Sequence, residues 1–459
     1  MAKKKTKELS PEERLQEALV PEDEWPYPIP ENWCWTKVKA LCDLKNGRAF
    51  KPSEWSERGL PIIRIQNLNN PDYGFNCFEG VVEADYRLYG GELLFAWSGT
   101  PGTSFGAHIW WGKDAVLNQH IFRVDIDEDV IDKSYFKYAI NQRLDRLISV
   151  AHGGAGLQHV TKGVFENTAI VFPPLNEQHR IVSRIESLFA KLDEAKEAAQ
   201  AVMDGFEDRK AAILHKAFTG ELTKEWREKH NRSLEEWVTK PWGDFLTRIE
   251  AGKNWNAEGR PPLNDEFGLV KVSAVTWGEF NEEESKTCFL EEQWNENVQI
   301  KSGDFLFSRA NTLQLVGNCV IVKTIQKKLM LSDKILRFSF NDIVRQEYVL
   351  YFTRSMMYRH QIEELASGNQ DGMRNISQKN VRLVIFPIPS LDEQGAIVKI
   401  LHSFFDNEAL ARELAESVLD QIDAMKKSIL ARAFRGELGT NDPGDESAVE
   451  LLKRVLSSG

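Results

Sequence analysis

The chain has 459 residues, of which 28% are charged and 42% hydrophobic, and a formal net charge of −11. This length suffices for two to four domains with cores of their own, while the acidic balance argues against indiscriminate binding of nucleic acid. Apolar runs are far shorter than the roughly 20 residues of a membrane helix, and the five cysteines are scattered, so we expect no membrane span, secretory signal, disulfide framework or zinc site, and a cytoplasmic location.

The chain begins with an N-terminal arm over residues 1–25, followed by a first variable domain over 26–174. Short β-like runs at Pro61–Ile65 and Glu92–Ala96 and one helix-like stretch at Lys133–Ser149 predict a mixed α/β domain. Polar residues follow the two runs, and a glycine-rich loop lies near the end of the domain. The candidate binding residues here are Arg64, Gln66, Asn67, Asn69, Ser98, Thr100, Thr103 and Gln158.

A long helix is predicted over 175–222. Asn176 is a suitable N-cap, Gly220 suits the position just beyond a helix end, and no proline intervenes. About 42 residues would extend roughly 63 Å at 1.5 Å per residue. A helix of that length generally needs a partner helix.

A linker over 223–240 leads to a second variable domain over 241–390. Its runs at Gly268–Val272 and Val320–Val322 and its helix-like stretch at Gln346–Leu365 again predict a mixed α/β fold. A second long helix, with Asp392 as its N-cap, is predicted over 391–438, and a tail follows over 439–459. The candidate binding residues of the second domain are Lys271, Ser273, Arg309, Asn311, Gln314, Gln370 and Arg374.

The two halves of the chain repeat each other. Residues 177–222 align without gaps with residues 393–438, at an offset of 216, and 19 of these 46 positions are identical. Fainter matches continue into the variable domains, for example Gly91–Phe95 with Gly303–Phe307. The period is too long for a solenoid, so the sequence indicates a duplicated domain with an internal pseudo-twofold repeat.

Apolar residues recur in both long helices at alternating spacings of three and four, which predicts a coiled-coil seam. In an antiparallel register small residues face large ones, and the two charged seam residues, Arg209 and Glu408, meet. The alternative is that each helix lies on its own domain. The seam residues that we single out are Leu188, Leu192, Phe206, Arg209, Ile213, Phe404, Glu408, Val418, Ile422, Met425 and Ile429.

The side-chain types in the loops favour DNA. Arg, Asn and Gln can bond guanine and adenine edges bidentately, and Ser, Thr, Lys and glycine-loop amides suit phosphates. Catalytic signatures are missing: the sequence has no phosphate-binding P-loop and no nucleophile elbow. Phe172–Leu175 only superficially matches the N-P-P-aromatic motif of amino-methyltransferases. We therefore predict a chain without catalytic residues, metal or cofactor.

Three sequence features characterise the complete layout: Pro174–Gln178 with Ala217–Leu222, Pro389–Gln394 with Ala433–Leu438, and the opening Ile29–Trp35. With these features the chain resembles the specificity subunit of type I restriction–modification enzymes. The resemblance implies a mixed α+β fold in which two target recognition domains are joined by two long antiparallel helices, an intramolecular coiled coil. Each domain would read one half of a split DNA target, and the helices would fix the spacing.

The resemblance also implies partners. Two modification subunits carrying S-adenosylmethionine would dock on the helices and recognition domains, and restriction subunits using ATP and magnesium would join through them. This prokaryotic chain would choose the sequence that its partners methylate or cut. Two alternatives remain open at this point: a coiled-coil scaffold with protein- or ligand-binding end domains, and a DNA methyltransferase with an unrecognised active site.

Overall fold

The computed structural model describes residues 10–70, 73–99, 105–154, 157–263, 265–276, 278–370 and 373–458. The chain divides into two compact units whose borders fall inside the long helices. Unit 1 comprises residues 1–198 and 418–459, and unit 2 comprises residues 199–417. Each unit therefore contains one variable domain together with segments of both long helices.

The main sheet of unit 1 is antiparallel, with the strand order β2-β10-β6-β8. The predicted run Glu92–Ala96 is confirmed as β6, a central strand whose last four residues are buried. Burial on both faces explains why this strand reads as a continuous apolar run rather than an alternating one. The bounds are β2 Cys42–Asn46, β6 Glu92–Ala96, β8 Gly106–Trp110 and β10 Ile121–Ile126.

Three smaller sheets complete the domain of unit 1, with the orders β4-β3-β9-β5, β1-β13 and β11-β12-β7. The pair β3 and β9 is parallel, whereas the other pairs are antiparallel. The bounds are β1 Cys34–Lys37, β3 Leu60–Ile63, β4 Cys77–Phe78, β5 Arg87–Leu88, β7 Ser98–Gly99, β9 Ala115–Leu117, β11 His152–Gly154, β12 Leu157–His159 and β13 Ala169–Phe172.

Two predictions for unit 1 need correction. The run expected at Pro61–Ile65 ends at Ile63, and the following residues form the short helix α2 (Ile65–Asn69). The stretch Lys133–Ser149 is two helices that meet at Arg143, whose ψ of 2° lies outside the helical range. The helices are α1 Pro11–Ala18, α2, α3 Lys133–Gln142, α4 Leu144–Ser149, α5 Lys162–Glu166 and α13 Ala448–Ser458, with 3₁₀ turns at Glu22–Glu24, Val38–Ala40, Pro52–Glu54 and Ala84–Tyr86.

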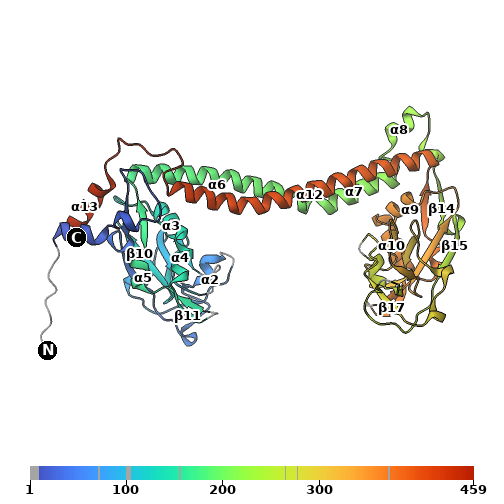
Figure 1. Cartoon of the computed structure of the whole chain (residues 1–459), viewed down its shortest axis with the longest axis horizontal. Coiled ribbons are helices and arrows are strands. Elements are labelled where there is room, and N and C mark those ends of the chain that lie inside the picture. Colours follow the sequence, from blue (N-terminus) through green and yellow to red (C-terminus); the bar gives the residue numbers. More distant parts are fainter. Residues whose placement is uncertain are drawn as a thin grey trace. The chain divides into compact units, whose positions relative to one another are not determined.

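Unit 2 repeats the strand orders of unit 1, except that the sheet corresponding to β4-β3-β9-β5 has three strands and, among the described residues, contains no counterpart of β5. Its sheets are β15-β22-β18-β20, β17-β16-β21, β14-β25 and β19-β24-β23, and the β16–β21 pair is again parallel. The duplication therefore extends through both variable domains (Figure 1). The strands are β14 Val238–Pro241, β15 Leu246–Ala251, β16 Phe267–Val270, β17 Ser285–Cys288, β18 Phe305–Ser308, β19 Ala310–Asn311, β20 Cys319–Ile321, β21 Lys328–Met330, β22 Ile335–Phe340, β23 Ser367–Gln370, β24 Met373–Asn375 and β25 Ile385–Ile388.

The helical stretch expected at Gln346–Leu365 is also divided, because Thr353–Ser355 separate two helices. The run expected at Gly268–Val272 ends at Val270 and is followed by the 3₁₀ helix η7 (Val272–Val275), the counterpart of α2. The helices of unit 2 are α8 Lys224–Lys229, α9 Gln346–Phe352, α10 Met356–Leu365 and α11 Gln378–Val381, with further 3₁₀ turns at Leu234–Glu236, Trp242–Asp244, Glu291–Gln293 and Glu296–Val298.

The long helices are present but differ between the copies. The first is α6 (Leu175–Asp204) followed by α7 (Phe206–Phe218), and the second is the continuous α12 (Leu391–Ala433). Gly205 interrupts the first copy only slightly, because its amide still bonds the carbonyl of Ala201 at 3.1 Å. Both helices start before the predicted N-caps, so Asn176 and Asp392 lie within the first turn. Gly220 and Gly436 have φ of +79° and +72°, as a glycine beyond a helix end requires.

The end of each long helix packs in the domain of the other copy. Ala433 and Phe434, at the end of α12, belong to the core of unit 1, and the ring of Phe434 lies 5.5 Å from that of Tyr135. Ala217 and Phe218, at the end of α7, belong to the core of unit 2, where Phe218 lies 5.3 Å from Tyr348. Within each unit the two helical segments therefore run antiparallel, and the arrangement with each helix on its own domain is wrong.

The glutamines that repeat at the starts of the two long helices, Gln178 and Gln394, hold each helix to its domain. Gln178 is fully buried; its amide nitrogen donates to the carbonyls of Val130 and Pro173, and its oxygen accepts from the amide of Asp132. Gln394 makes the equivalent bonds in unit 2. A buried amide with all these bonds fixes the angle at which the helix leaves the domain.

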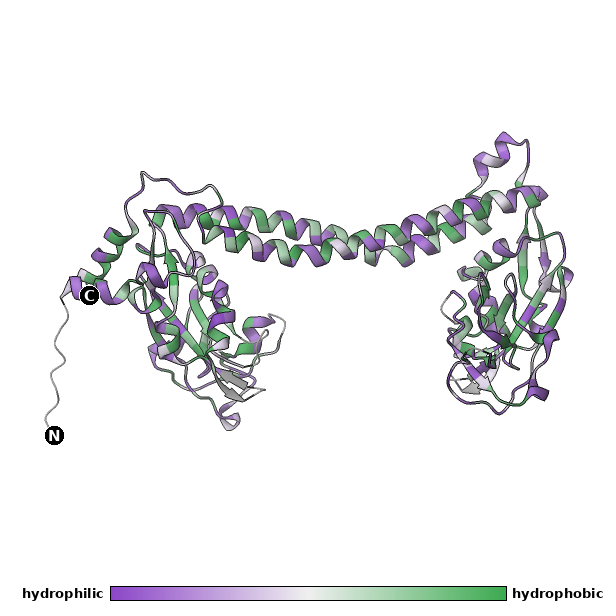
Figure 2. Cartoon of the chain, in the orientation of Figure 1, coloured by the Kyte–Doolittle hydropathy of each residue, from purple (hydrophilic) through white to green (hydrophobic). Residues whose placement is uncertain are grey.

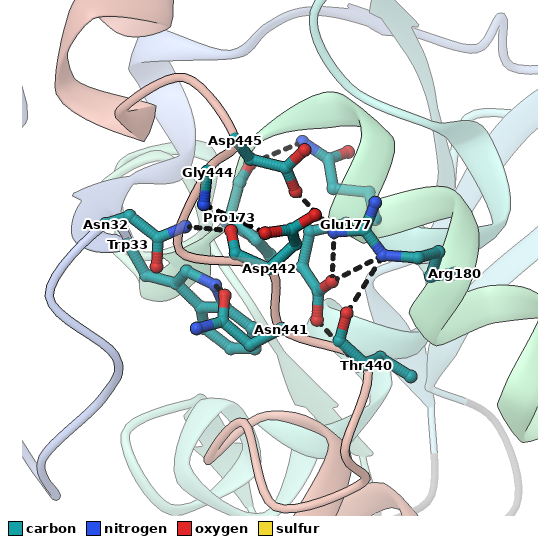
Figure 3. A network of polar contacts seen from close by, with 11 residues as sticks. Asn32, Trp33, Pro173, Glu177, Arg180, Thr440, Asn441, Asp442, Gly444 and Asp445 are labelled. Atoms are coloured by element: carbon teal, nitrogen blue, oxygen red, sulfur yellow. Dashed lines mark hydrogen bonds and ion pairs between the residues drawn. The ribbon is translucent and has the colours of Figure 1, made fainter.

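The repeated glutamate holds the segment that follows the opposite helix. In unit 1, Glu177 accepts from the hydroxyl of Thr440 at 2.6 Å and from Arg180 at 2.7 Å, and Arg180 also pairs with Asp445 (Figure 3). Trp33 donates to Asn441 in the same network. The tail therefore lies against the first domain, and its helix α13 contacts α1 through a bond from Arg14 to Leu456.

In unit 2 the linker occupies the same place. Glu393 is 2% exposed and accepts from Thr223 at 2.7 Å, from Arg227 at 2.6 Å and from the indole of Trp237 at 3.0 Å. Arg227 also donates to the carbonyl of Gly220. A buried carboxylate and a buried guanidinium are thus paired, and neither is left uncompensated.

Hydrophobic residues concentrate on the strands inside each domain, whereas the long helices alternate hydrophobic and hydrophilic residues along their length (Figure 2). Over the described ranges, none of the helices combines the length and the apolar character needed to cross a bilayer. The long helices therefore bury one stripe each, as amphipathic helices do.

Candidate nucleic-acid interface

The short helix α2 and its N-cap residue, Arg64, contain four of the predicted binding residues of unit 1, and these residues divide into two groups. Asn67 is 4% exposed; its side chain accepts from the amide of Arg64 and donates to the carbonyls of Tyr73 and Gly74. Its amide therefore closes the loop and is not available to a base edge. Arg64 and Gln66 are half-exposed and Asn69 is exposed, so these three side chains can reach a ligand.

Arg64 and Gln66 form one hydrogen-bonding unit. The guanidinium of Arg64 lies 5.2 Å from the centre of the Trp55 ring. With its amide oriented to satisfy both groups, Gln66 accepts from this guanidinium at 3.1–3.2 Å. The aromatic face and the amide hold the arginine in place before any ligand binds, which lowers the entropy cost of a bidentate contact.

A three-stranded sheet gathers further candidates of unit 1. β7 pairs with β12, so that Ser98 is opposite His159 and Gly99 is opposite Gln158. Ser98 is 3% exposed, however, and its hydroxyl is not presented to solvent. Thr100 and Thr103 lie outside the described residues, as does the side chain of Gln158.

Unit 2 builds the same sheet from different side chains. β19 pairs with β24, so that Asn311 is opposite Arg374. The amide of Asn311 donates to the hydroxyl of Thr276 at 3.3 Å, and Arg374 donates to the carbonyl of Gly368. The backbone of Gln370 lies in β23, while its side chain is outside the described residues. Two residues separated by 63 positions in sequence are thus brought together by the sheet.

The remaining candidates of unit 2 differ in their availability. Lys271 donates to the carbonyl of Gly259, and Ser273 donates to Glu284 at 2.6 Å, so both are occupied locally. Gln314 is exposed. Arg309 is half-exposed, and its guanidinium forms no hydrogen bond or ion pair with the described part of the chain. Arg309 is therefore the candidate best placed to bind an incoming group.

Arg309 occupies the same backbone position as Trp97 in unit 1. The amide of Trp97 bonds the carbonyl of His120 and its carbonyl accepts from Val160; Arg309 makes the same two bonds with Lys334 and Ile376. The two domains thus present an indole and a guanidinium from one common backbone frame. Side chains of such different chemistry suit different base sequences.

His120 and Lys334 were missed by the sequence argument, because they lie in the turn before β10 and β22, outside every stretch with a recognisable pattern. His120 lies against Trp97, with ring centres 5.4 Å apart. Burial, followed by the charges of His159 and Arg64, lowers the pKa of His120. The imidazole is therefore held neutral near other nitrogen-rich groups, and a nearby phosphate would favour its protonated form.

In the described ranges, no three His, Cys, Asp or Glu side chains are grouped so as to hold a metal ion. The five cysteines are free, and burial raises the pKa of the Cys34, Cys42 and Cys319 thiols to about 12. A thiol with such a pKa is a poor nucleophile near neutral pH.

The seam of the long helices contains the charged pair required by the antiparallel register. In unit 2 the guanidinium of Arg209 bonds both carboxylate oxygens of Glu408 at 2.7 Å, and Arg412 lies over the Phe206 ring. This pairing lowers the pKa of Glu408. Ile213 and Phe404 are half-buried in the same unit.

In unit 1 the buried stripe departs from the predicted heptads. Ile422 is 3% exposed, and Leu188, Leu192 and Ile429 are half-buried, but Val418 and Met425 are 39% and 45% exposed. The next residues, Leu419 and Lys426, turn inward instead. A straight α-helix has 3.6 residues per turn, so its buried stripe drifts away from a strict 3.5-residue repeat. Lys426 covers the ring of Phe189 and pairs with Asp193.

These features define a class of protein with two copies of one α/β domain, each presenting polar loops and each attached to segments of two antiparallel helices. The family described as type I restriction modification DNA specificity domain matches residues 30–201 and 235–419. The chain belongs to this family.

Relatives match over most of their length. The specificity subunit of the type I restriction enzyme EcoKI from Escherichia coli K12 is 24% identical over 461 residues, covering 93% of this chain and 95% of that one. The MjaVIII specificity subunit from Methanocaldococcus jannaschii is 25% identical over 430 residues, covering 89% and 94%. The crystal structure of the HsdS subunit from Thermoanaerobacter tengcongensis shares the fold, with a TM-score of 0.60 and 18% identity, over 90% of this chain and 100% of that one.

Proposed function

We propose that this chain is the DNA-reading subunit of a type I restriction–modification system, without catalytic residues of its own. Each variable domain reads one half of a bipartite target, and the paired helices set the number of unread base pairs between the halves. The observation that carries the proposal is the common backbone frame that presents Trp97 in one domain and Arg309 in the other. One frame with unlike side chains suits two unlike half-sites.

The chemistry of methylation and cleavage lies on partners in this proposal. Two modification subunits with S-adenosylmethionine dock on the helices and domains, and restriction subunits with ATP and magnesium join through them. The net charge of −11 fits a chain that obtains part of its phosphate contacts from such partners. The subunits act together in the prokaryotic cytoplasm.

The test is a methylation map of the complex with its modification subunits, followed by binding assays on the mapped site. Arg309→Ala should weaken binding by about 1–3 kcal/mol for the half-site that unit 2 reads, if the guanidinium contacts a base. Arg64→Ala should act on the other half-site. Arg248→Ala serves as a control, because this side chain is 68% exposed on β15 and pairs with Glu250.

The outcomes separate the proposal from its alternatives. Methylation of a bipartite sequence, with each arginine variant affecting one half, supports it. Binding that is weak and independent of sequence even with the modification subunits present would instead favour a scaffold. Binding of S-adenosylmethionine by the isolated chain would favour a methyltransferase.

A further inference from the structure

A pocket in unit 1 lies beside the free edge of the main sheet. Its volume is about 730 Å³, within the roughly 300–1,000 Å³ of ordinary ligand sites. Strand β8, helix α3 and the segment from α2 to Phe75 form its walls. All of these walls belong to one unit, and none of the described lining residues is Asp or Glu. The pocket is therefore a concave site whose lining carries no negative side chain.

The strand edge that faces the pocket leaves one peptide group open. β8 pairs with β6 on one side only. On the other side, the side-chain amide of Asn141 donates to the carbonyl of Ala107 at 3.0 Å and accepts from its N–H at 2.7 Å. Residues two apart on a strand direct their backbone groups to the same side, so the N–H and C=O of Ile109 also face away from β6. Within the described part of the chain neither group has another partner, so a donor and an acceptor are open to a ligand.

Two nitrogen-bearing side chains line the pocket without an acidic partner. The Nε2 atom of His108 is buried and has no hydrogen-bond partner among the described residues. Lys137 is half-buried and forms no ion pair there; its ammonium lies 4.5 Å from the centre of the Tyr138 ring. Burial lowers the pKa of both side chains, and the charge of Lys137 lowers the pKa of His108 further, while Glu186, outside the lining, raises the pKa of Lys137. A bound anion would supply the partner that both nitrogens lack.

The second copy of the domain shows that the fold does not require these groups. The pairing of β8 with β6 matches that of β20 with β18, and α3 and α9 are fixed by the same side-chain bonds, so the two copies align residue by residue. In unit 2, aliphatic side chains replace three lining residues of unit 1: Val320 for His108, Val322 for Trp110 and Leu350 for Lys137. Packing alone is thus satisfied by aliphatic residues, and the polar and aromatic groups of unit 1 need another explanation.

Aromatic rings form the rest of the pocket. Phe75 and Trp110 are in edge-to-face contact, with ring centres 6.3 Å apart. The indole of Trp110 donates to the carbonyl of Lys113 at 3.1 Å and lies so close to Gly112 that a Cβ there would have no room. Trp111, which is 77% exposed, is at the rim. Aromatic faces that are held in place in this way are suited to stacking on a flat ring.

We propose that this pocket binds a single nucleotide, with the base stacked among the aromatic rings and the phosphate at Lys137 and His108. The Watson–Crick edge of each base carries a donor beside an acceptor, which suits the open N–H and C=O of Ile109. A peptide strand fits less well, because one open peptide group cannot continue a ladder of main-chain bonds. The nucleotide is either free or turned out of a nucleic acid, since both sources present the same ring and phosphate. The inference goes beyond the proposed function and does not rest on it.

Titration of the full chain with the monophosphate of 2-aminopurine riboside tests the free form. Its fluorescence should be quenched on binding, because 2-aminopurine loses fluorescence when it stacks. The riboside without phosphate should bind about tenfold or more weakly, since it cannot pair with the desolvated cation. In Lys137→Leu this difference between the two compounds should disappear. Trp110→Val should weaken both compounds alike, because it removes a stacking face.

Variants that carry the side chains of unit 2 separate binding from folding. Lys137→Leu and His108→Val should unfold at the same or a higher temperature than the wild type, because each removes a desolvated polar group. A loss of affinity without a loss of stability then excludes misfolding as its cause. Trp111→Ala at the exposed rim should also weaken binding, and it leaves the core unchanged. The matched control is Lys133→Leu, one turn earlier on α3, where the lysine pairs with Glu128 instead; it should keep the wild-type affinity.

A short DNA duplex with one extrahelical 2-aminopurine tests the second source, and the same duplex with the analogue paired is its control. Quenching of the extrahelical base that Lys137→Leu and Trp111→Ala reduce, without binding of the free nucleotide, assigns the pocket to a base turned out of DNA. The proposal is overturned if neither probe is quenched, or if the pocket variants bind both probes as the wild type does. Either result leaves the proposed function intact, because the methylation map does not depend on this pocket.

Discussion

The buried pair of Arg227 and Glu393 provides a quantitative test of how the second domain is attached to its helices. The two side chains are 7% and 3% exposed. Replacing Glu393 by Gln removes the charge but keeps the shape, so the buried Arg227 would retain only neutral acceptors, namely the introduced amide oxygen, the carbonyl of Gly220 and the hydroxyl of Thr223. Breaking a buried pair in this way costs about 3–5 kcal/mol.

The matched substitution in unit 1 should cost less. Glu177 is buried as well, but its partner Arg180 is 38% exposed and remains solvated when the carboxylate is lost. Burial raises the pKa of Glu177 despite the bonds from Thr440 and Arg180. The charged form of Glu177 is therefore already disfavoured, and Glu177→Gln should cost about 1–2 kcal/mol, the scale of ordinary hydrogen bonds.

Hydrogen exchange followed by mass spectrometry measures the effect locally, which matters because a chain of two units need not unfold in one step. In Glu393→Gln, amides of 219–237 should exchange roughly a hundred- to several-thousand-fold faster, since each 1.4 kcal/mol is a factor of ten. A double variant, Arg227→Met with Glu393→Leu, should recover much of the protection. The reasoning is refuted if the double variant is no better than the single one, or if Glu177→Gln has the larger effect.

Three further predictions concern other parts of the chain. Asn67→Ala should lower the free energy of unfolding of unit 1 by about 1–3 kcal/mol, because the amide closes the loop. It should weaken DNA binding equally on all sequences. A loss of affinity that depends on the identity of one base pair would mean that the amide contacts a base. Gly436→Ala should lower the free energy of unfolding by more than the control Gly439→Ala, which measures only the left-handed backbone strain of roughly 1–2 kcal/mol. A Cβ at position 436 would lie 2.5 Å from Pro30, whereas a Cβ at position 439 would meet open space. Equal losses of stability in denaturant titrations would contradict this prediction. Burial lowers the pKa of His108 below its usual 6.5, so the unfolded state takes up the proton at a higher pH than the folded state does. The free energy of unfolding of unit 1 should therefore fall as the pH drops below about 6.5. A His108→Gln variant with the same pH dependence of thermal unfolding would refute this.

The sequence determined the duplication and favoured the antiparallel pairing of the helices over an arrangement with each helix on its own domain. The repeated Ala-Phe-x-Gly-Glu-Leu segment carries its own helix end, because glycine alone adopts a positive φ there without strain. The charges of Arg209 and Glu408 suggested the register, and their pairing in unit 2 agrees with it. These features depend on spacing within one helix, and such local information is present in a single sequence.

The candidate DNA contacts were only partly predictable. Polar residues after strands were recognised, but Asn67 and Ser98 proved to be buried, and Ser273 bonds a neighbouring side chain. Sequence gives the chemical type of a residue but not the direction of its side chain or the partners that satisfy it. His120 escaped notice for the same reason, because its position beside Trp97 results from the pairing of distant strands.

By itself, the sequence decided that two like halves exist and that each ends in a long helix, and it favoured an antiparallel pairing of the helices. Only the tertiary structure decided that the helix end of one half is buried in the domain of the other, where Phe434 meets Tyr135 and Phe218 meets Tyr348. It also decided which of the described polar side chains are occupied by neighbouring groups, as Asn67 and Ser273 are. The physical reason is that helix periodicity and end signals act within about four residues along the chain, whereas burial and unpaired charge depend on segments far apart in sequence.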